Sequence, residues 1–232
     1  MQTITPSLLA ASLALAFDAS AADITLLHFN DLHARLTPHA DLVEHDGHPH
    51  VADRGGLARL ATLVKRIREA KPSAQLLNVG DTYHGGVEAL YTNGNAVVPP
   101  VNALGVDVGV PGNWDFAYGP HITRLRYASF SLMEGRTLRQ EAGGDVMRPN
   151  FVNLAANLSY SQPAFRAGQP VMPATLLKTV NGVKVGFVGL TSDIVADMHE
   201  RLATGFNFVT GEMDTLKVQG RLFRLEGTDA DA

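Results

Sequence analysis

The sequence predicts an α/β fold, and three similar stretches of chain carry this prediction. Each is a short apolar run that ends in a loop with polar side chains, at residues 24–29, 74–79 and 106–110. Apolar runs of this length, without helical spacing, are typical of strands in a parallel sheet. Helical patterns lie between them, and strands that alternate with helices favour a parallel sheet with helices packed against it.

The composition agrees with a globular domain. The chain has 232 residues, a formal net charge of −4 and 45% hydrophobic residues, which suits one domain with a sizeable core. The mild acidity and the lack of a basic run give no support for nucleic-acid binding. No cysteine is present, which excludes disulfides and thiolate metal ligands.

Residues 1–21 are predicted to be a signal peptide. Residues 8–17 form a compact apolar core, and Ala19-Ser20-Ala21 supplies the small residues of a cleavage site. The stretch is too short to span a bilayer. It lacks a Lys or Arg before the core, and a buried N-terminal helix is the alternative. The prediction places residues 22–232 in a bacterial periplasm or outside the cell.

The first strand, residues 24–29, is expected to be buried on both faces, and two potential metal ligands follow it. Asp31 and His33 are two residues apart, so in extended chain both side chains point to the same side. A turn-forming Asp and a surface His are the simpler explanation of this pair alone. Residues 34–54 are then expected to form a polar, irregular loop. Its four histidines could bind a transition metal, but they show no regular spacing: His39, His45, His48 and His50.

The next two strand ends add further candidates. A helix with one apolar face is predicted over residues 55–70, and Lys71-Pro72 ends it. The second strand leads to Asp81. In the same loop, His84 is a candidate for substrate contact and equally a plain surface histidine. A helix over 96–104, with prolines in its first turn, precedes the third strand, which leads to Asn113.

Ligands of open α/β sheets collect at the edge where the strands end. We therefore expect four side chains to meet there: Asp31, His33, Asp81 and Asn113. One imidazole, a carboxylate, a second carboxylate able to bridge and a neutral amide suit a site for two divalent cations.

The rest of the chain predicts elements around the sheet. Residues 118–149 have helical character and contain arginines that could steer an anion but are more simply solvated, at Arg124, Arg126, Arg136 and Arg139. A further strand is expected within 151–158, and a hairpin at 174–190 around the turn Asn181-Gly182. Ser192 is expected to cap a short helix over 193–199.

The order Asp31-x-His33, Gly80-Asp81, Gly112-Asn113 resembles that of the calcineurin-like metallophosphoesterases, over about residues 23–216. Residues 27–33, 55–60 and 102–107 are similar to the secreted 5′-nucleotidases and the related thiosulfohydrolases. The resemblance implies a four-layer α/β/β/α sandwich. It also implies two divalent ions (Mn, Zn or similar), with Asp31 and His33 on the first, Asn113 on the second and Asp81 as the bridge. The implied reaction is hydrolysis of a small phosphate monoester, such as a nucleotide, by a hydroxide held between the ions.

The chain departs from the family in its later histidines. The family completes its centre with a His on a later strand and with a Gly-His-x-His loop, and neither is matched here, because His199 is the only histidine after His121. We therefore expect residues 22–232 to form a catalytic domain without its C-terminal strands. Such a domain would bind one ion at most, weakly, and would turn over little substrate.

A second departure lies at Trp114 and Ala117, where the nucleotidase loop has a His and an Asp that stabilise the transition state. Trp114 thus occupies the position of the catalytic acid and is not expected to act as one. The thiosulfohydrolases also carry Trp at this position. Three functions stay open: a 5′-nucleotidase-type phosphoesterase, a thiosulfohydrolase acting on a cysteine S-thiosulfonate of a carrier protein, and an inactive fragment that keeps only the fold. Neither nucleic acid nor a membrane span is expected.

Overall fold

The structure is a computed structural model that describes residues 23–209 and two short strands near the C-terminus, β11 (Leu216–Val218) and β12 (Arg221–Phe223). The predicted signal peptide, residues 1–21, lies outside the described residues. The centre of the fold is a four-stranded parallel sheet, which confirms the α/β prediction. Its strands, in spatial order, are β1 (Leu26–Phe29), β4 (Gln75–Asn78), β5 (Val108–Gly109) and β6 (Val152–Asn153).

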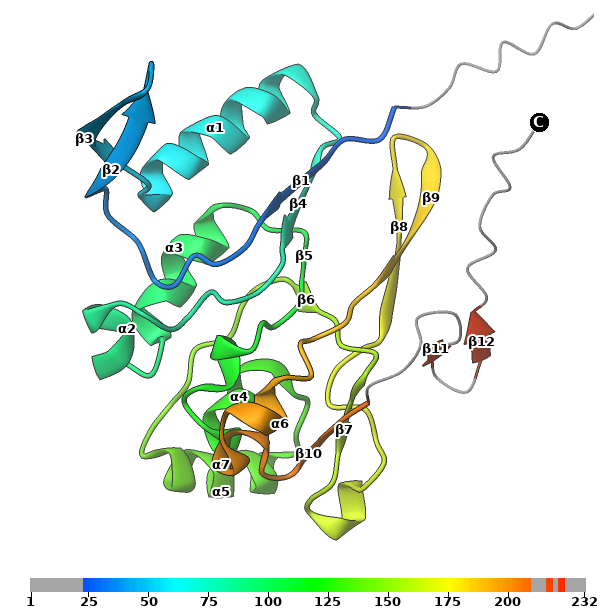
Figure 1. The fold of residues 1–232 in the computed structure, drawn as a ribbon. Helices are drawn as coiled ribbons and strands as arrows, with labels where there is room; N and C mark the ends of the chain where they lie inside the picture. The colour runs from blue at the N-terminus through cyan, green and yellow to red at the C-terminus, as the bar shows by residue number, and fades with distance from the viewer. Residues whose placement is uncertain (1–22, 210–215, 219–220, 224–232) are drawn as a thin grey trace, which may run out of the picture.

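Helices connect these strands, and Figure 1 shows α1 and α3 on one side of the sheet and the β8–β9 hairpin on the other. The helices are α1 (Leu57–Ala70), α2 (Val87–Tyr91), α3 (Val98–Ala103), α4 (Pro120–Tyr127), α5 (Leu132–Ala142), α6 (Val195–Met198) and α7 (Glu200–Ala203). Single 3-10 turns are η1 (Asn95–Val97), η2 (Trp114–Phe116) and η3 (Ala164–Arg166). None of the helices described is long and apolar enough to cross a membrane.

Local sequence accounts for several of these elements. Helix α1 buries Leu57 and Val64 on its apolar face, and it ends at Lys71, whose N–H donates to the carbonyl of Ile67. Helix α3 starts with proline in its first turn, where a missing N–H costs no hydrogen bond. Both helices were predicted from the sequence and are confirmed, with boundaries shifted by one or two residues.

The hairpin predicted around Asn181-Gly182 is also confirmed. Strands β8 (Thr175–Val180) and β9 (Val183–Val188) pair antiparallel, with Val180 opposite Val183. The two turn residues have φ of 48° and 79°. Positive φ at both central positions is the mark of a type I′ turn, whose twist matches that of the strands.

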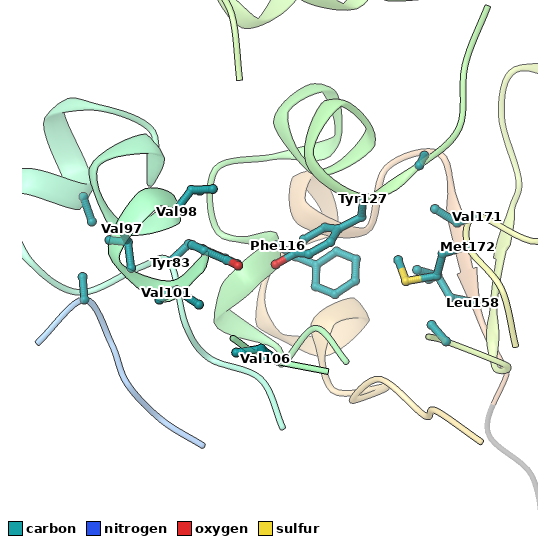
Figure 2. Packing of buried hydrophobic residues seen from close by; sticks show 14 of the residues in the cluster. Tyr83, Val97, Val98, Val101, Val106, Phe116, Tyr127, Leu158, Val171 and Met172 are labelled. Carbon is teal, nitrogen blue, oxygen red and sulfur yellow. The ribbon is translucent and has the colours of Figure 1, made fainter. Parts of the chain in front are cut away.

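The main core lies beside the loops that follow β4 and β5, and Figure 2 shows its buried side chains. Two aromatic residues from those loops, Tyr83 and Phe116, are 1% and 0% exposed and pack together with Tyr127 of α4 and the valines of α3. Because each loop contributes a fully buried ring, the chain just beyond the strand ends is anchored in the core.

Strand β1 differs from the expectation that it is buried on both faces. Its residues alternate between exposed and half-buried, and Leu26 is 48% exposed. The reason is its place in the sheet: β1 is an edge strand that pairs only with β4 among the described strands. Only the face that carries Leu27 and Phe29 packs against the core.

The irregular loop expected over residues 34–54 is instead largely a hairpin, so that prediction is wrong. Strands β2 (His39–His45) and β3 (His48–Arg54) are joined by Asp46-Gly47, and both turn residues have positive φ. In this register His45 faces His48 and Val43 faces His50. Since alternate residues of a strand share a face, the register places all four histidines on one face of the hairpin.

Two smaller expectations are corrected in the second half. The strand expected within 151–158 is two strands, since β6 joins the main sheet while β7 (Leu158–Tyr160) pairs with β10 (Phe206–Phe208). Ser192 does not cap a helix. Helix α6 begins three residues later, after Ile194 and without a side-chain cap, because residues 193 and 194 form a turn rather than helix.

Helix α5 begins with a capping box in which one carboxylate has several partners. The Ser131 side chain accepts from the N–H of Glu134, and Glu134 accepts in return from the N–H of Ser131. Arg166 of η3 also binds Glu134 through two parallel hydrogen bonds of 2.6 and 2.8 Å. These contacts, Arg166 first, lower the pKa of Glu134 to about 2.

Replacing Glu134 by Gln is expected to destabilise the fold in a pH-dependent way. A carboxyl whose pKa is lower in the folded state stabilises the protein above its unfolded pKa, and this stabilisation is lost as pH falls toward the folded value. We expect Glu134→Gln to lower the free energy of unfolding by about 1–2 kcal/mol at pH 7, with the difference shrinking between about pH 4.5 and pH 2. Urea unfolding across this range measures it. The exposed Glu44→Gln on β2 is the control, and a constant difference at every pH would contradict the assignment.

Candidate metal centre

The ends of β1 and β4 continue side by side into the loops that carry the predicted ligands. Beyond the last strand residues, the N–H groups of Asp31, His33 and Ala34 donate to the carbonyls of Gly80, Asp81 and Thr82 at 3.1, 2.9 and 3.1 Å. The backbone hydrogen bonds of the parallel pair thus extend past the strands. This pairing fixes the two loops relative to each other and brings their side chains to one edge of the sheet.

Three of the four predicted metal ligands meet at this edge. The Nε2 atom of His33 lies 3.4 Å from Oδ1 of Asp31 and 3.8 Å from Oδ2 of Asp81. One ligand atom from each residue lies within 4.8 Å of the others, and no other group of three His, Asp or Glu residues does so within the part of the chain that the structure describes. Asp31 is exposed, His33 is half-buried and Asp81 is buried, so the cluster opens to solvent on the Asp31 side.

The backbone of all three residues is unusual. Asp31, His33 and Asp81 have φ of 51°, 44° and 54°, in the left-handed region that few residues other than glycine adopt. The side chains therefore converge through a tight turn, and not through the extended chain that the i, i+2 spacing suggested. Non-glycine residues held in this region cluster at functional sites, and here each carries a potential ligand atom.

The chemistry of this donor set fits a divalent cation. Two carboxylate oxygens and one imidazole nitrogen are ligands that Zn²⁺ and Mn²⁺ accept. The buried Asp81 divides its oxygens: Oδ1 accepts from the N–H of Trp114 at 2.7 Å, while Oδ2 faces His33. Burial raises the pKa of Asp81, and the nearby Asp115 and Asp31 raise it further against the N–H of Trp114 and the charge of His33. A cation at the cluster would favour the ionised carboxylate.

The fourth predicted ligand, Asn113, lies next to this cluster with its amide nitrogen 3.3 Å from the sulfur of Met198. Its side-chain oxygen accepts no hydrogen bond from the described residues. It follows β5 and directly precedes Trp114, whose N–H binds Asp81. The structure thus groups Asp31, His33 and Asp81 and places Asn113 at their margin.

Two glycines make the close approach of the loops possible. A Cβ on Gly80, whose φ is +94°, would lie 2.4 Å from the backbone nitrogen of Gly112. A Cβ on Gly112 would meet the Asp81 side chain and, at 2.5 Å, the Asp81 backbone nitrogen. Each glycine therefore leaves the space that the other motif occupies: Gly80 makes room for Gly112, and Gly112 makes room for Asp81.

Asp115 joins the same two loops and was not singled out from the sequence. It is 2% exposed. Its Oδ1 accepts from the N–H groups of Thr82 and Tyr83 at 2.9 and 3.0 Å, and its Oδ2 accepts from Gly112 at 2.9 Å. Burial raises its pKa, and these three hydrogen bonds lower it. The sequence feature that could have identified Asp115 is its position, a carboxylate in the short turn directly after Gly112-Asn113.

Aromatic residues flank the cluster. The His84 ring stacks on Trp114, with centroids 5.0 Å apart and 17° between the planes, and Tyr118 lies 5.6 Å from His84. Burial lowers the pKa of His84, followed by the charge of His33, which favours a neutral imidazole. Trp114 is 40% exposed. It therefore presents an indole, and no ionisable group, beside Asp81.

Arg126 corrects the expectation that the arginines of 118–149 are solvated. It is 1% exposed, its guanidinium lies 4.9 Å from the ring centre of Tyr83, and it donates to the carbonyl of Asn93.

His199, the only histidine after His121 in the sequence, has a structural role. Its Nδ1 accepts from the N–H of Arg201 at 3.1 Å and caps α7.

Comparison with known proteins adds to this geometry. Residues 24–163 match the family model described as calcineurin-like phosphoesterase. The 5′-nucleotidase of Bos taurus is 34% identical over 175 residues, which are 73% of this chain and 26% of that protein. A snake venom 5′-nucleotidase of Gloydius brevicauda is 28% identical over 184 residues, or 77% and 27% of the two chains. This chain thus spans about a quarter of the length of these relatives.

Solved structures show the same fold. The NAD nucleotidase of Haemophilus influenzae superposes with a TM-score of 0.59 at 20% identity, over 81% of this chain and 29% of that one. The sulfate thiohydrolase SoxB of Thermus thermophilus superposes with a TM-score of 0.58 at 22% identity, over 82% of this chain and 40% of that one.

Proposed function

Because this chain belongs to the calcineurin-like phosphoesterase family, we propose that it hydrolyses a phosphate monoester with the help of a divalent metal, as a 5′-nucleotidase-type enzyme. The observation that carries the proposal is the convergence of Asp31, His33 and Asp81 at the ends of two parallel strands. The 5′-nucleotidase relatives support a nucleotide as the substrate.

In this proposal Asp31, His33 and Asp81 would hold the cation, and Asn113 lies at the margin of this group. A divalent ion held there would neutralise phosphoryl oxygens and would make hydroxide available near neutral pH. The protein itself fixes the positions of these ligand side chains. The N–H of Trp114 fixes Oδ1 of Asp81, and Asp115 ties the two loops together. A preorganised centre of this kind supplies most of the catalytic effect of a phosphoryl-transfer enzyme.

We propose that the described residues hold one ion rather than two. Only one trio of ligand atoms converges among them, and the second ion would depend on Asp81 and the neutral Asn113. An amide is a weaker ligand for Zn²⁺ or Mn²⁺ than imidazole. We also propose that residues 22–232 form the catalytic domain and that the chain is exported.

The indole of Trp114 restricts the leaving groups that the site can release. An indole cannot donate a proton as an acid, so the site lacks the group that would protonate a poor leaving group, a contribution of typically 10²–10⁴ in rate. We propose that His84 contacts the substrate beside Trp114 without replacing this acid, because burial favours its neutral form. Esters of good leaving groups are therefore the favoured substrates.

We expect p-nitrophenyl phosphate to be cleaved at least about 100-fold faster than AMP in the presence of Mn²⁺. The double substitution Trp114→His with Ala117→Asp should narrow that ratio, because it restores an imidazole and a carboxylate in the loop. Initial rates with both esters, with and without a chelator, measure this. Equal rates for AMP and the aryl ester in the unaltered protein would contradict the role given to Trp114. Full activity in the presence of a chelator would contradict the requirement for a metal ion.

Trp114 also favours a second candidate, hydrolysis of the terminal sulfonate of a cysteine S-thiosulfonate (Cys–S–S–SO₃⁻) on a carrier protein, because the persulfide that leaves as sulfate is released is a good leaving group. A peptide bearing a cysteine S-thiosulfonate tests it in the same assay. Release of sulfate from this peptide without cleavage of either phosphate ester would replace the phosphoesterase proposal. Metal binding without turnover of any of the three would support a fragment that keeps only the fold.

A further inference from the structure

A cavity of about 460 Å³ lies apart from the metal cluster, between α4, α5 and the segment that contains η3. None of its lining residues belongs to the cluster or to the loops that hold it. The apolar part of its wall is formed by Pro120, Phe130, Met133, Leu138, Tyr160 and Phe165. Met133 and Phe165 are 81% and 66% exposed, so apolar side chains also mark its mouth. This size and lining are typical of sites for small molecules.

The two carboxylates and one of the two arginines that line the cavity have close side-chain neighbours. Glu134 is bound by both arms of Arg166, and His121 lies 2.8 Å from Glu141. Arg124 forms no ion pair with a carboxylate of the described residues. Its Nη2 donates to the carbonyls of Gln162 and Gly205, and its buried Nε has no partner. Arg124 is therefore the guanidinium of the cavity wall that has no carboxylate within ion-pair distance among the described residues, although Glu141 and Glu134 lie close enough to act on its charge.

The guanidinium of Arg124 is also held in place. It lies 5.5 Å from the ring centre of Tyr160 and 5.4 Å from that of Phe206. It packs so closely on Gly205 that a side chain there would collide with it. A cation fixed between aromatic rings and partly removed from water favours an anion nearby. Because the Arg124 side chain is already ordered, its ordering would cost an incoming anion little binding affinity.

We propose that this cavity binds a small amphipathic anion, with a flat apolar body between α5 and the η3 segment and a carboxylate or phosphate group at Arg124. The aromatic and proline side chains offer flat surfaces to the body, and Arg124, which has no carboxylate of the described residues bound to it and whose buried Nε has no partner among them, provides the contact for the charged group. The site is independent of the phosphoesterase proposal, because no residue is shared between the two.

The test uses 1-naphthoate and its neutral counterpart 1-naphthamide, titrated calorimetrically into the 232-residue chain. We expect naphthoate to bind with a dissociation constant on the order of 0.1 mM and the amide to bind at least tenfold more weakly. Arg124→Met should weaken naphthoate at least tenfold and leave the amide unchanged. Arg136→Met, on the exposed face of the same α5 helix that borders the cavity, is the matched control and should change neither.

A second variant keeps the proposal testable if Arg124→Met does not fold. Thr137→Trp adds a large side chain from the cavity wall and should abolish binding of both ligands while circular dichroism and p-nitrophenyl phosphate hydrolysis stay unchanged. Equal affinity for acid and amide would overturn the role of Arg124 as a charge selector. The absence of binding by either ligand to the folded chain, or unchanged binding in Thr137→Trp, would overturn the site itself.

Discussion

Replacing Asp81 by Asn is expected to reduce affinity for Mn²⁺ or Zn²⁺ by well over 100-fold and to abolish metal-dependent ester hydrolysis. Loss of an outer hydrogen-bond partner of a ligand already costs about 10–100-fold, and Asp81 is here the ligand itself. Asn keeps the size and tolerates the left-handed backbone at φ 54°, so the change removes charge with little strain. Calorimetric titration of metal and the aryl phosphate assay measure the two effects.

The control for this variant is the exposed Glu44→Gln on the face of the β2–β3 hairpin opposite the histidines, which removes one carboxylate charge away from the cluster. His33→Asn should behave like Asp81→Asn, because His33 supplies the only imidazole of the three. If Asp81→Asn binds metal as tightly as the unaltered chain, the cluster at the strand ends is not the metal site, and the histidine face of the hairpin becomes the next candidate.

Replacing Asp115 by Asn is expected to give the largest loss of stability of any single carboxylate change, about 2–4 kcal/mol. Both Asp115 oxygens accept from backbone N–H groups, three in total. In Asn one oxygen becomes an NH₂ group that faces a donor, and an unsatisfied buried donor costs about 1–3 kcal/mol in addition to the lost hydrogen bond. Chemical denaturation of the metal-free chain measures it.

A purely local role for Asp115 would leave metal binding intact in the molecules that remain folded. We expect otherwise, because Asp115 joins the loop of Asp81 to the loop of Asn113, and its loss should also weaken metal affinity under conditions where the variant is fully folded. Asp145→Asn, an exposed partner of Arg139, is the control for removal of a paired carboxylate. Unchanged stability in Asp115→Asn would show that water or backbone shifts can replace the three hydrogen bonds.

Much of this site could be predicted from the sequence because it depends on a simple rule of parallel sheets. Strands that run in the same direction end at the same edge, so Asp31, His33 and Asp81 had to approach one another if 24–29 and 74–79 were strands. The type I′ turn at Asn181-Gly182 was predictable for a different reason, because a short local pattern determines it.

Other features depended on contacts that the sequence does not display. The left-handed backbone at the ligands arises from hydrogen bonds to a neighbouring loop, and the role of Asp115 from three donors, two of them more than thirty positions away. The β2–β3 hairpin was missed because its residues do not alternate strictly between apolar and polar, although Asp46-Gly47 was an available turn signal. Arg126 was taken as solvated because its aromatic partner, Tyr83, is distant in sequence.

The left-handed backbone of the three clustered residues restricts which substitutions this edge of the sheet can accept during evolution or in a mutational library. A β-branched or bulky residue at position 31, 33 or 81 meets a steric obstacle before any question of metal binding arises. Asn and Gly fit the backbone but carry no charge. Aspartate tolerates the left-handed backbone and supplies a charged ligand at positions 31 and 81. Selection for a foldable turn and selection for an anionic ligand would therefore favour the same residue type at these two positions.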